Sequence, residues 1–252
     1  MKFSLGLAAS TLAFALAAGS MTGAQAAELQ VIAGGATTAP LKEIAANFEK
    51  ESGHKLVIRF GTTPELIKMA TGGPFDVGLV PHEVFKDAAA LARFAPGAAT
   101  EVVRVGLGVA VPAGAPKPDI GTPDAFKQTL LKAKSIAAVP QSAAGYQITA
   151  IFERMGITDA VKDKIKAQPS PGAVRDVLAK GEAEIGVFLI NALMGPGVDV
   201  IGPFPGDLQR EVFFAAQVAA DAKQPDAAKA FIAYVKSPAA TAIFKARGMT
   251  PN

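Results

Sequence analysis

The 252-residue chain contains no cysteine and no tryptophan, and its only histidines are His54 and His82. The lack of cysteine excludes disulfide bridges and thiolate-bound metals, so the fold depends on packing alone. Two imidazoles are too few for an all-histidine zinc site and poor material for a Ser-His-Asp triad. We therefore expect no metal and no cofactor, and the common hydrolytic chemistries are disfavoured.

A strong excess of charge is also missing, because the formal net charge is +3. Removal of Lys2 with the N-terminal segment leaves 24 basic against 22 acidic residues, or +2. This balance excludes a basic nucleic-acid binder. The chain is 50% hydrophobic, and at this length it can bury a substantial core in one large or two small domains.

Residues 1–26 have the pattern of a secretory signal peptide. Lys2 precedes an uncharged apolar run from Leu5 to Ala18, and Ala24-Gln25-Ala26 forms a small-x-small cleavage site. The run is too short to span a bilayer comfortably, and no later stretch offers about twenty uninterrupted apolar residues. We expect cleavage after Ala26 and a soluble protein exported to the periplasm.

Strands and helices alternate after the signal segment. Leu41, Ile44, Ala45 and Phe48 recur at the spacing of one helical face, and Ser52-Gly53 ends that helix. Strands are predicted at 31–32, 55–60 and 76–80. A second helix is predicted from Thr63, as N-cap before Pro64, to about Thr71. This βαβαβ order predicts a mainly parallel sheet.

The same order repeats beyond a long predicted strand, 102–111. Strands are predicted at 136–139, 184–189 and 212–218. Helices are predicted after the turn at 140–145, from Ser170-Pro171, and over 226–235 and 238–246. We expect an α/β fold of two lobes, each with a mixed, mainly parallel sheet flanked by helices. Lobe 1 comprises 27–104 plus 211–252, and lobe 2, 105–210, is inserted into it.

Two short turns point to the ligand. Gly34–Thr38 and Gly61–Pro64 each follow an apolar strand and open a helix. The first N–H groups of a helix lack intrahelical partners and lie at the positive end of its dipole, and threonine hydroxyls add donors. The turns therefore predict a cradle for a small anion, in a cleft at the carboxyl ends of the strands.

Several segments, taken in order, resemble the molybdate-binding family of type II periplasmic solute-binding proteins. They are 41–48 followed by Phe60-Gly61-Thr62-Thr63, Phe75-Asp76-Val77, Ser142–Gly145 before a helix ending at Met155-Gly156, and Gly181–Gly186. The resemblance implies a monomeric component of an ABC importer that closes on a small anion, delivers it to an inner-membrane permease and performs no chemistry.

The resemblance also implies positions for the ligand contacts. The family's two turn serines fall on Ala36 and Thr63 and its tyrosine on Leu189, while backbone donors fall on Ala144 and near Val174. Two of the family's hydroxyls are therefore missing. The expected ligand-binding residues are Ala36, Thr37, Thr38, Thr62, Thr63, Ala144, Gly145, Val174 and Leu189. Additional candidates are His82, Arg104 and Ser142.

Alternatives remain open at this stage. A small di- or tricarboxylate competes with a molybdate- or tungstate-like oxyanion, because Arg104 or Arg59 offers a two-donor fork for a carboxylate. An exported hydrolase or transferase would have to use Ser142 with His82, although no Gly-x-Ser-x-Gly elbow is present. A periplasmic sensor subunit is a third reading. The threonines and serines also suit ordinary helix caps, and the arginines suit edge positions.

Overall fold

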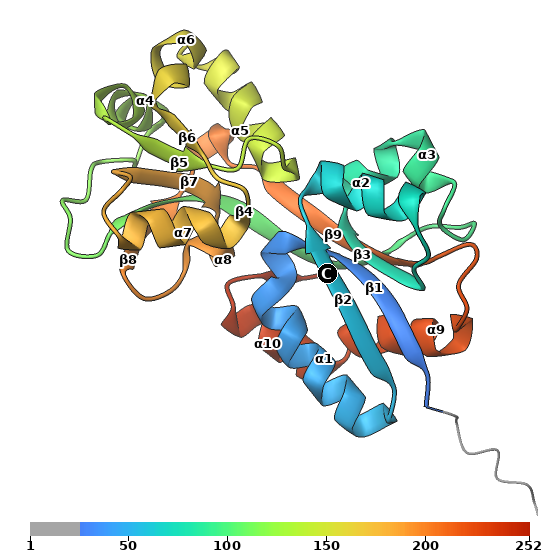
Figure 1. The fold of residues 1–252 in the computed structure, drawn as a ribbon. Coiled ribbons are helices and arrows are strands. Elements are labelled where there is room, and N and C mark those ends of the chain that lie inside the picture. The colour runs from blue at the N-terminus through green and yellow to red at the C-terminus, as the bar shows by residue number, and fades with distance from the viewer. Residues whose placement is uncertain (1–25) are drawn as a thin grey trace, which may run out of the picture.

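The computed structural model describes residues 26–252 as a mixed α/β fold (Figure 1). The predicted signal segment lies, apart from Ala26, outside the described residues. The strands are β1 (Glu28–Gly34), β2 (Lys55–Gly61), β3 (Val77–Pro81), β4 (Thr100–Pro112), β5 (Ile136–Ala138), β6 (Ile165–Ala167), β7 (Ile185–Leu189), β8 (Val198–Pro203), β9 (Glu211–Val218) and β10 (Thr250–Pro251).

Helices follow most strands, as the sequence pattern predicts. The α-helices are α1 (Thr38–Ser52), α2 (Thr63–Gly72), α3 (Ala88–Leu91), α4 (Pro123–Lys132), α5 (Ala143–Arg154), α6 (Thr158–Val161), α7 (Pro171–Ala179), α8 (Ile190–Leu193), α9 (Pro225–Val235) and α10 (Pro238–Ala246). Short 3-10 turns are η1 (Gly35–Thr37), η2 (His82–Lys86), η3 (Lys162–Lys164) and η4 (Gly206–Leu208). In the described part of the chain, no helix has the length and apolar character needed to cross a bilayer.

The first group of strands contains β1, β2, β3 and β9. β1 lies between β2 and β3 and runs parallel to both, which confirms the predicted mainly parallel arrangement there. β9 pairs with β3 in the antiparallel sense. The C-terminal helices also belong to this group, because Phe48 of α1 packs edge-on against Phe231 and Tyr234 of α9 at ring distances of 5.2 and 5.3 Å.

The second group contains β5, β6, β7 and β8. β5 runs parallel to both β6 and β7. β4 belongs to both groups, because Thr100–Gly106 pairs with β9 whereas Leu107–Pro112 pairs with β7 and β8. In Figure 1 the two groups lie apart, each with its own helices, and β4 and β9 run between them. The carboxyl ends of β1, β2 and β7 are followed by the turns that face the space between the groups.

Several elements were not predicted from the sequence, and α3, α6, α8 and β10 are among them. α4 was not predicted, although Thr122 caps it by accepting a hydrogen bond from the Ala125 N–H at 3.1 Å and Pro123 begins it. β6 and β8 were also missed. β6 has only three residues, and β8 is partly buried without a clear period-two pattern. Short edge strands of this kind are fixed by their neighbours rather than by their own sequence.

Candidate functional site

A small cavity lies where the turns before α1, α2, α5 and α7 meet. We call it the inner cavity. Its lining residues are Gly34, Gly35, Ala36, Gly61, Thr62, Thr63, Pro81, Ser142, Ala143, Ala144, Pro171, Phe188, Leu189, Val212 and Phe214. The volume that the centre of a water molecule can occupy in it is about 30 Å³. One water needs about 10–15 Å³ by this measure. The cavity therefore suits a group of roughly carboxylate or oxyanion size.

The donors of the inner cavity come from helix starts. α2 and α5 are ten and twelve residues long, and their first residues, Thr63 and Ala143, line the cavity. The first N–H groups of each helix lack intrahelical acceptors and carry the positive end of the dipole. None of the residues in the lining is charged. The arrangement is chemically suited to hold an anion by N–H and hydroxyl donors.

The hydroxyl of Thr63 is the polar group that points most directly to a ligand in the inner cavity. Thr63 is 4% exposed, and within residues 26–252 its Oγ1 is buried without a hydrogen-bond partner. A buried hydroxyl without a partner costs about 1–3 kcal/mol, so a group that supplies an acceptor recovers this energy. Thr63 lines the inner cavity, where a bound anion would be that acceptor.

The prediction that Thr63 is the N-cap was wrong, because Thr62 occupies that position. The Thr62 N–H and Oγ1 both donate to the Glu65 carboxylate, at 2.7 and 2.9 Å. This capping box uses the donors of Thr62, which lines the cavity but keeps none of them for a ligand. It also explains why the Thr63 hydroxyl is left over.

Three other predicted hydroxyls bond to nearby backbone carbonyls. Thr37 Oγ1 donates to Gly34 at 2.8 Å and Thr38 Oγ1 to Gly35 at 2.7 Å. Ser142 Oγ donates to Val139 at 2.7 Å. These bonds shape the turns before α1 and α5. The structure therefore assigns these side chains to the support of the cradle.

The remaining predicted contacts divide between lining and support. Ala36, Ala144 and Leu189 line the inner cavity. Gly145 and Val174 are not among its lining residues. Gly145 donates its N–H to Ser142 Oγ at 2.9 Å, and Val174 is fully buried in the core. Resemblance to a family indicates positions along the chain but does not tell which atoms face the cavity.

The structure places the candidate arginines and His82 outside the inner cavity. Arg104 lies 3.1 Å from Glu211, and Arg59 donates to the Pro74 carbonyl at 2.9 Å. Neither lines the inner cavity. His82 stacks on Phe213, with ring centroids 5.8 Å apart, and lines a separate pocket. Arg59 lies in β2, Arg104 in β4 and His82 directly after β3, and each of them contacts groups outside the inner cavity.

A wide groove adjoins the inner cavity and was not predicted. We call it the outer groove. Gly35, Ala36, Gly61, Thr62 and Pro171 line both spaces. The groove offers about 890 Å³ by the same measure. Its charged lining residues are Lys42, Glu65, Arg175 and Arg247, and Thr38 and Asn191 also line it.

Asn191 connects the two sides of the outer groove. It lies in α8, directly after β7, and its Nδ2 donates to the Ala36 carbonyl of η1 at 2.8 Å. Its Oδ1 is buried and has no hydrogen-bond partner within residues 26–252. The sequence did carry a signal here, because ligand-contacting side chains in α/β folds gather just beyond the carboxyl ends of strands.

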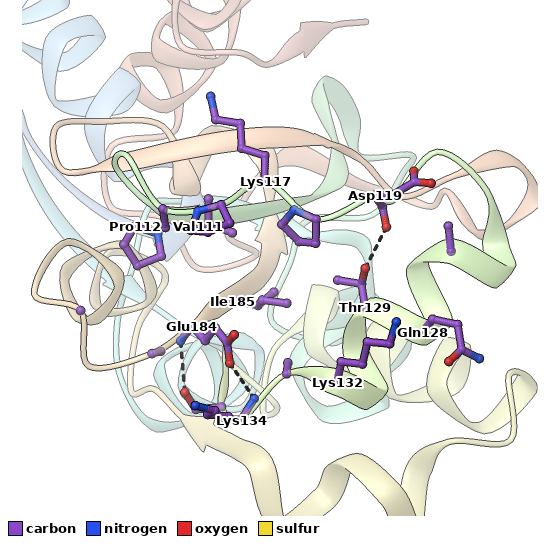
Figure 2. A pocket seen from close by; sticks show the side chains of 18 residues that line it. Val111, Pro112, Lys117, Asp119, Gln128, Thr129, Lys132, Lys134, Glu184 and Ile185 are labelled. Atoms are coloured by element: carbon purple, nitrogen blue, oxygen red, sulfur yellow. Dashed lines mark hydrogen bonds between the residues drawn. The ribbon is translucent and has the colours of Figure 1, made fainter.

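Another large cavity, drawn in Figure 2, lies at the opposite end of the second strand group. It is lined by residues at the amino ends of β5 and β7, whereas ligands of open α/β sheets bind at the carboxyl ends. Two of its polar side chains are paired: Thr129 donates to the Asp119 carbonyl at 2.8 Å, and Glu184 accepts from the Lys134 N–H at 2.7 Å. In the part of the chain that the structure describes, none of its lining side chains is a buried polar group without a partner. The inner cavity is therefore the better candidate for the functional site.

A cleft between two α/β groups, with helix starts aimed into it, defines a solute-binding protein of the type II fold. The chain matches the family model for bacterial extracellular solute-binding proteins over residues 29–250, and it belongs to that family. It is 34% identical over 263 residues to the molybdate-binding protein ModA of Azotobacter vinelandii, with 98% of each chain covered. The expected resemblance to molybdate-binding proteins is thus confirmed.

Other proteins similar to this chain include one that is named as an enzyme and one solved with an organic anion bound. The chain is 31% identical over 230 residues to an aconitate isomerase from a Pseudomonas species, covering 88% of this chain and 87% of that protein. The solved periplasmic molybdate-binding protein of Azotobacter vinelandii superposes with a TM-score of 0.68 at 21% identity, covering 88% of this chain and 98% of that one. A solved protein with bound L-phospholactate has the same fold, with a TM-score of 0.68, 17% identity and coverage of 89% and 100%.

Proposed function

We propose that the chain is the periplasmic solute-binding component of an ABC importer, which captures a small anion in the inner cavity and delivers it to an inner-membrane permease. The observation that carries the proposal is the buried, unpartnered Thr63 Oγ1 beside the starts of α2 and α5. The family to which the chain belongs and the molybdate-binding relatives of the chain support the same role. Export through the N-terminal signal and a monomeric state are part of the proposal.

The two lobes, 27–104 plus 211–252 and 105–210, close on the ligand by bending of the strands that join them. β4 belongs to both strand groups, and β9, which pairs with it, begins where the chain returns to lobe 1, so these two strands form the hinge. Closure buries the anion among donors from both lobes and brings their rims together for the permease. Asn191 donates across this cleft to Ala36 and holds the closed form.

Two classes of anion compete for the inner cavity. A molybdate- or tungstate-like oxyanion is supported by the identity to ModA. One carboxylate of a small di- or tricarboxylate is supported by the absence of the family's hydroxyls at Ala36 and Leu189. It is also supported by the relationship to a protein named for an isomerase of aconitate, a tricarboxylate. Both classes use the same N–H donors.

Capture without turnover is part of the same proposal. Ser142 donates to a backbone carbonyl and His82 lines another pocket, so this pair does not meet to act as nucleophile and base. Incubation of the mature protein with cis- or trans-aconitate, followed by chromatography, should return the starting isomer. Conversion of one aconitate isomer into the other would show that the protein is an enzyme and would contradict this part of the proposal.

A thermal-shift screen of the mature protein, residues 27–252, tests the capture of anions. A ligand at a hundred times its dissociation constant stabilises the native state by about 2.7 kcal/mol. For a chain of this size the midpoint should rise by about 5–11 °C. The screen compares molybdate, tungstate, sulfate and di- and tricarboxylates with sodium chloride at equal ionic strength. Midpoints equal to the chloride control for every anion at millimolar concentration would refute the proposal.

Asn191→Leu should speed release of whichever anion the screen identifies. The variant keeps the volume of the side chain but removes the 2.8 Å bond to the Ala36 carbonyl, which is worth about 0.5–1.5 kcal/mol in the closed form. We expect dissociation to be about 2- to 12-fold faster, with an association rate near that of the original. Stopped-flow competition measures both rates. An unchanged dissociation rate would show that Asn191 does not hold the lobes together.

A further inference from the structure

Arg175 is a cation of the outer groove with unused hydrogen-bond donors. It lies in α7, four residues after Pro171, which lines both the inner cavity and the groove. The one hydrogen bond that its guanidinium makes within residues 26–252 joins Nη2 to Asp176 Oδ1 at 3.1 Å. A guanidinium has five N–H donors, so this bond leaves four for a ligand.

The other arginine of the groove, Arg247, is tied to a different helix. Arg247 Nη2 lies 2.8 Å from Glu43 Oε2, an ion pair between α10 and α1. Glu65, the acidic side chain of the lining, is held by both donors of Thr62 in the capping box. Arg175 is paired only with its neighbour Asp176 in the same helix, at 3.1 Å, and Asp176 does not line the groove. Lys42 is exposed and forms no ion pair within residues 26–252.

The chain after α8 makes room for Arg175. Gly195 has φ of 151°, a conformation that residues with side chains rarely adopt. A Cβ at this position would lie 2.9 Å from Arg175 Cδ and 3.3 Å from Nη1, so the arginine passes directly over the glycine. The Arg175 side chain is 36% exposed. It is thus laid along the wall of the groove, with part of it open to the groove.

The spacing fits one ligand with two charged groups. Four residues of helix correspond to about 6 Å of rise between Pro171 and Arg175. A group in the inner cavity and a second group on the guanidinium would be separated by a short carbon chain. A planar two-donor fork matches a carboxylate, whereas a free tetrahedral oxyanion would fill the inner cavity and leave Arg175 unused.

We propose that Arg175 binds a second anionic group of the ligand, so that the outer groove is a carboxylate subsite and the ligand is a small organic di- or tricarboxylate. This inference rests on the proposed capture of an anion in the inner cavity. The first carboxylate meets Thr63 and the helix starts, and the second meets the guanidinium of Arg175. The chain that joins them occupies the groove between Pro171 and Arg175.

Isothermal titration of the mature protein with paired ligands tests the subsite. Tricarballylate and succinate carry a second carboxylate, and succinamate replaces one carboxylate of succinate by a neutral amide. We expect succinate to bind at least tenfold more tightly than succinamate. Arg175→Gln should lower succinate and tricarballylate affinity at least tenfold and leave succinamate affinity within threefold. Arg175→Lys should recover only part of the loss, because an ammonium lacks the fork.

The matched control is Arg247→Gln, which removes an arginine of the same groove that Glu43 already holds, and it should change affinity less than threefold. Equal affinity for succinate and succinamate, or an Arg175→Gln variant that binds dicarboxylates as the original does, would overturn the subsite. The ligand comparison needs no variant, so it decides even if Arg175→Gln misfolds. Molybdate binding without carboxylate binding would refute this inference and leave anion capture standing. Binding of no anion would refute both.

Discussion

Thr63→Val should stabilise the ligand-free protein, or leave its stability unchanged, while weakening anion binding by about 10- to 150-fold. The two side chains have nearly the same shape, so the change removes only a buried hydroxyl that lacks a partner within residues 26–252. Removing an unsatisfied polar group recovers part of its desolvation cost, whereas the bound anion loses a hydrogen bond worth about 1.5–3 kcal/mol. Chemical denaturation measures the first effect and calorimetric titration the second.

Thr62→Val is the matched control for Thr63→Val. The Thr62 hydroxyl donates to Glu65 at 2.9 Å and belongs to the cap of α2. Its removal should cost about 0.5–2 kcal/mol of stability and change affinity only slightly. The two neighbouring variants thus have opposite signatures. Equal affinity of Thr63→Val and the original protein would show that the hydroxyl does not contact the ligand.

Gly145→Ala should destabilise the protein by about 3–5 kcal/mol, an unusually large effect for the addition of one methyl group. A Cβ at this position would lie 2.1 Å from the Val139 carbonyl oxygen and 2.4 Å from that of Pro140. Both atoms belong to the backbone of the turn before α5, so no side-chain rotation relieves the overlap. The start of α5 must shift, and the inner cavity that it lines must change with it.

Gly172→Ala makes the same change in the first turn of α7. A Cβ at Gly172 meets no atom within 4 Å. Because alanine favours helices more than glycine does, this variant should be unchanged or up to about 1 kcal/mol more stable. Urea unfolding followed by circular dichroism compares the two variants. A Gly145→Ala protein as stable as Gly172→Ala would contradict the close packing of α5 on its turn.

Much of the fold could be predicted from local sequence patterns. The apolar face of α1, the left-handed Gly53 that ends it, and the caps of α5, α7 and α10 at Ser142, Ser170 and Ser237 all have short-range causes. The cap of α2 was misplaced by one residue, because Thr62 and Thr63 are equally good caps until Glu65 selects the first. That choice depends on a reciprocal pair of bonds rather than on residue type.

The candidate site was harder to predict, because it depends on which face of each element meets the cleft. Arg104 was a candidate for the site, and an edge position was the alternative; in the structure it contacts Glu211 and Asn252. Arg175 was missed because it lies a full turn inside α7, and a helix-start argument looks only at the first residues. The Arg175 side chain packs against Gly195, twenty residues further along the chain, and no local sequence pattern predicts that contact.

A crystal structure of the mature protein, grown with the tightest anion from the thermal-shift screen, tests the central claim most directly. The account predicts an anionic group in the inner cavity, with an oxygen about 2.6–3.2 Å from Thr63 Oγ1 and from N–H groups at the starts of α2 and α5. A ligand bound elsewhere, such as in the cavity of Figure 2, with only water beside Thr63, would contradict it.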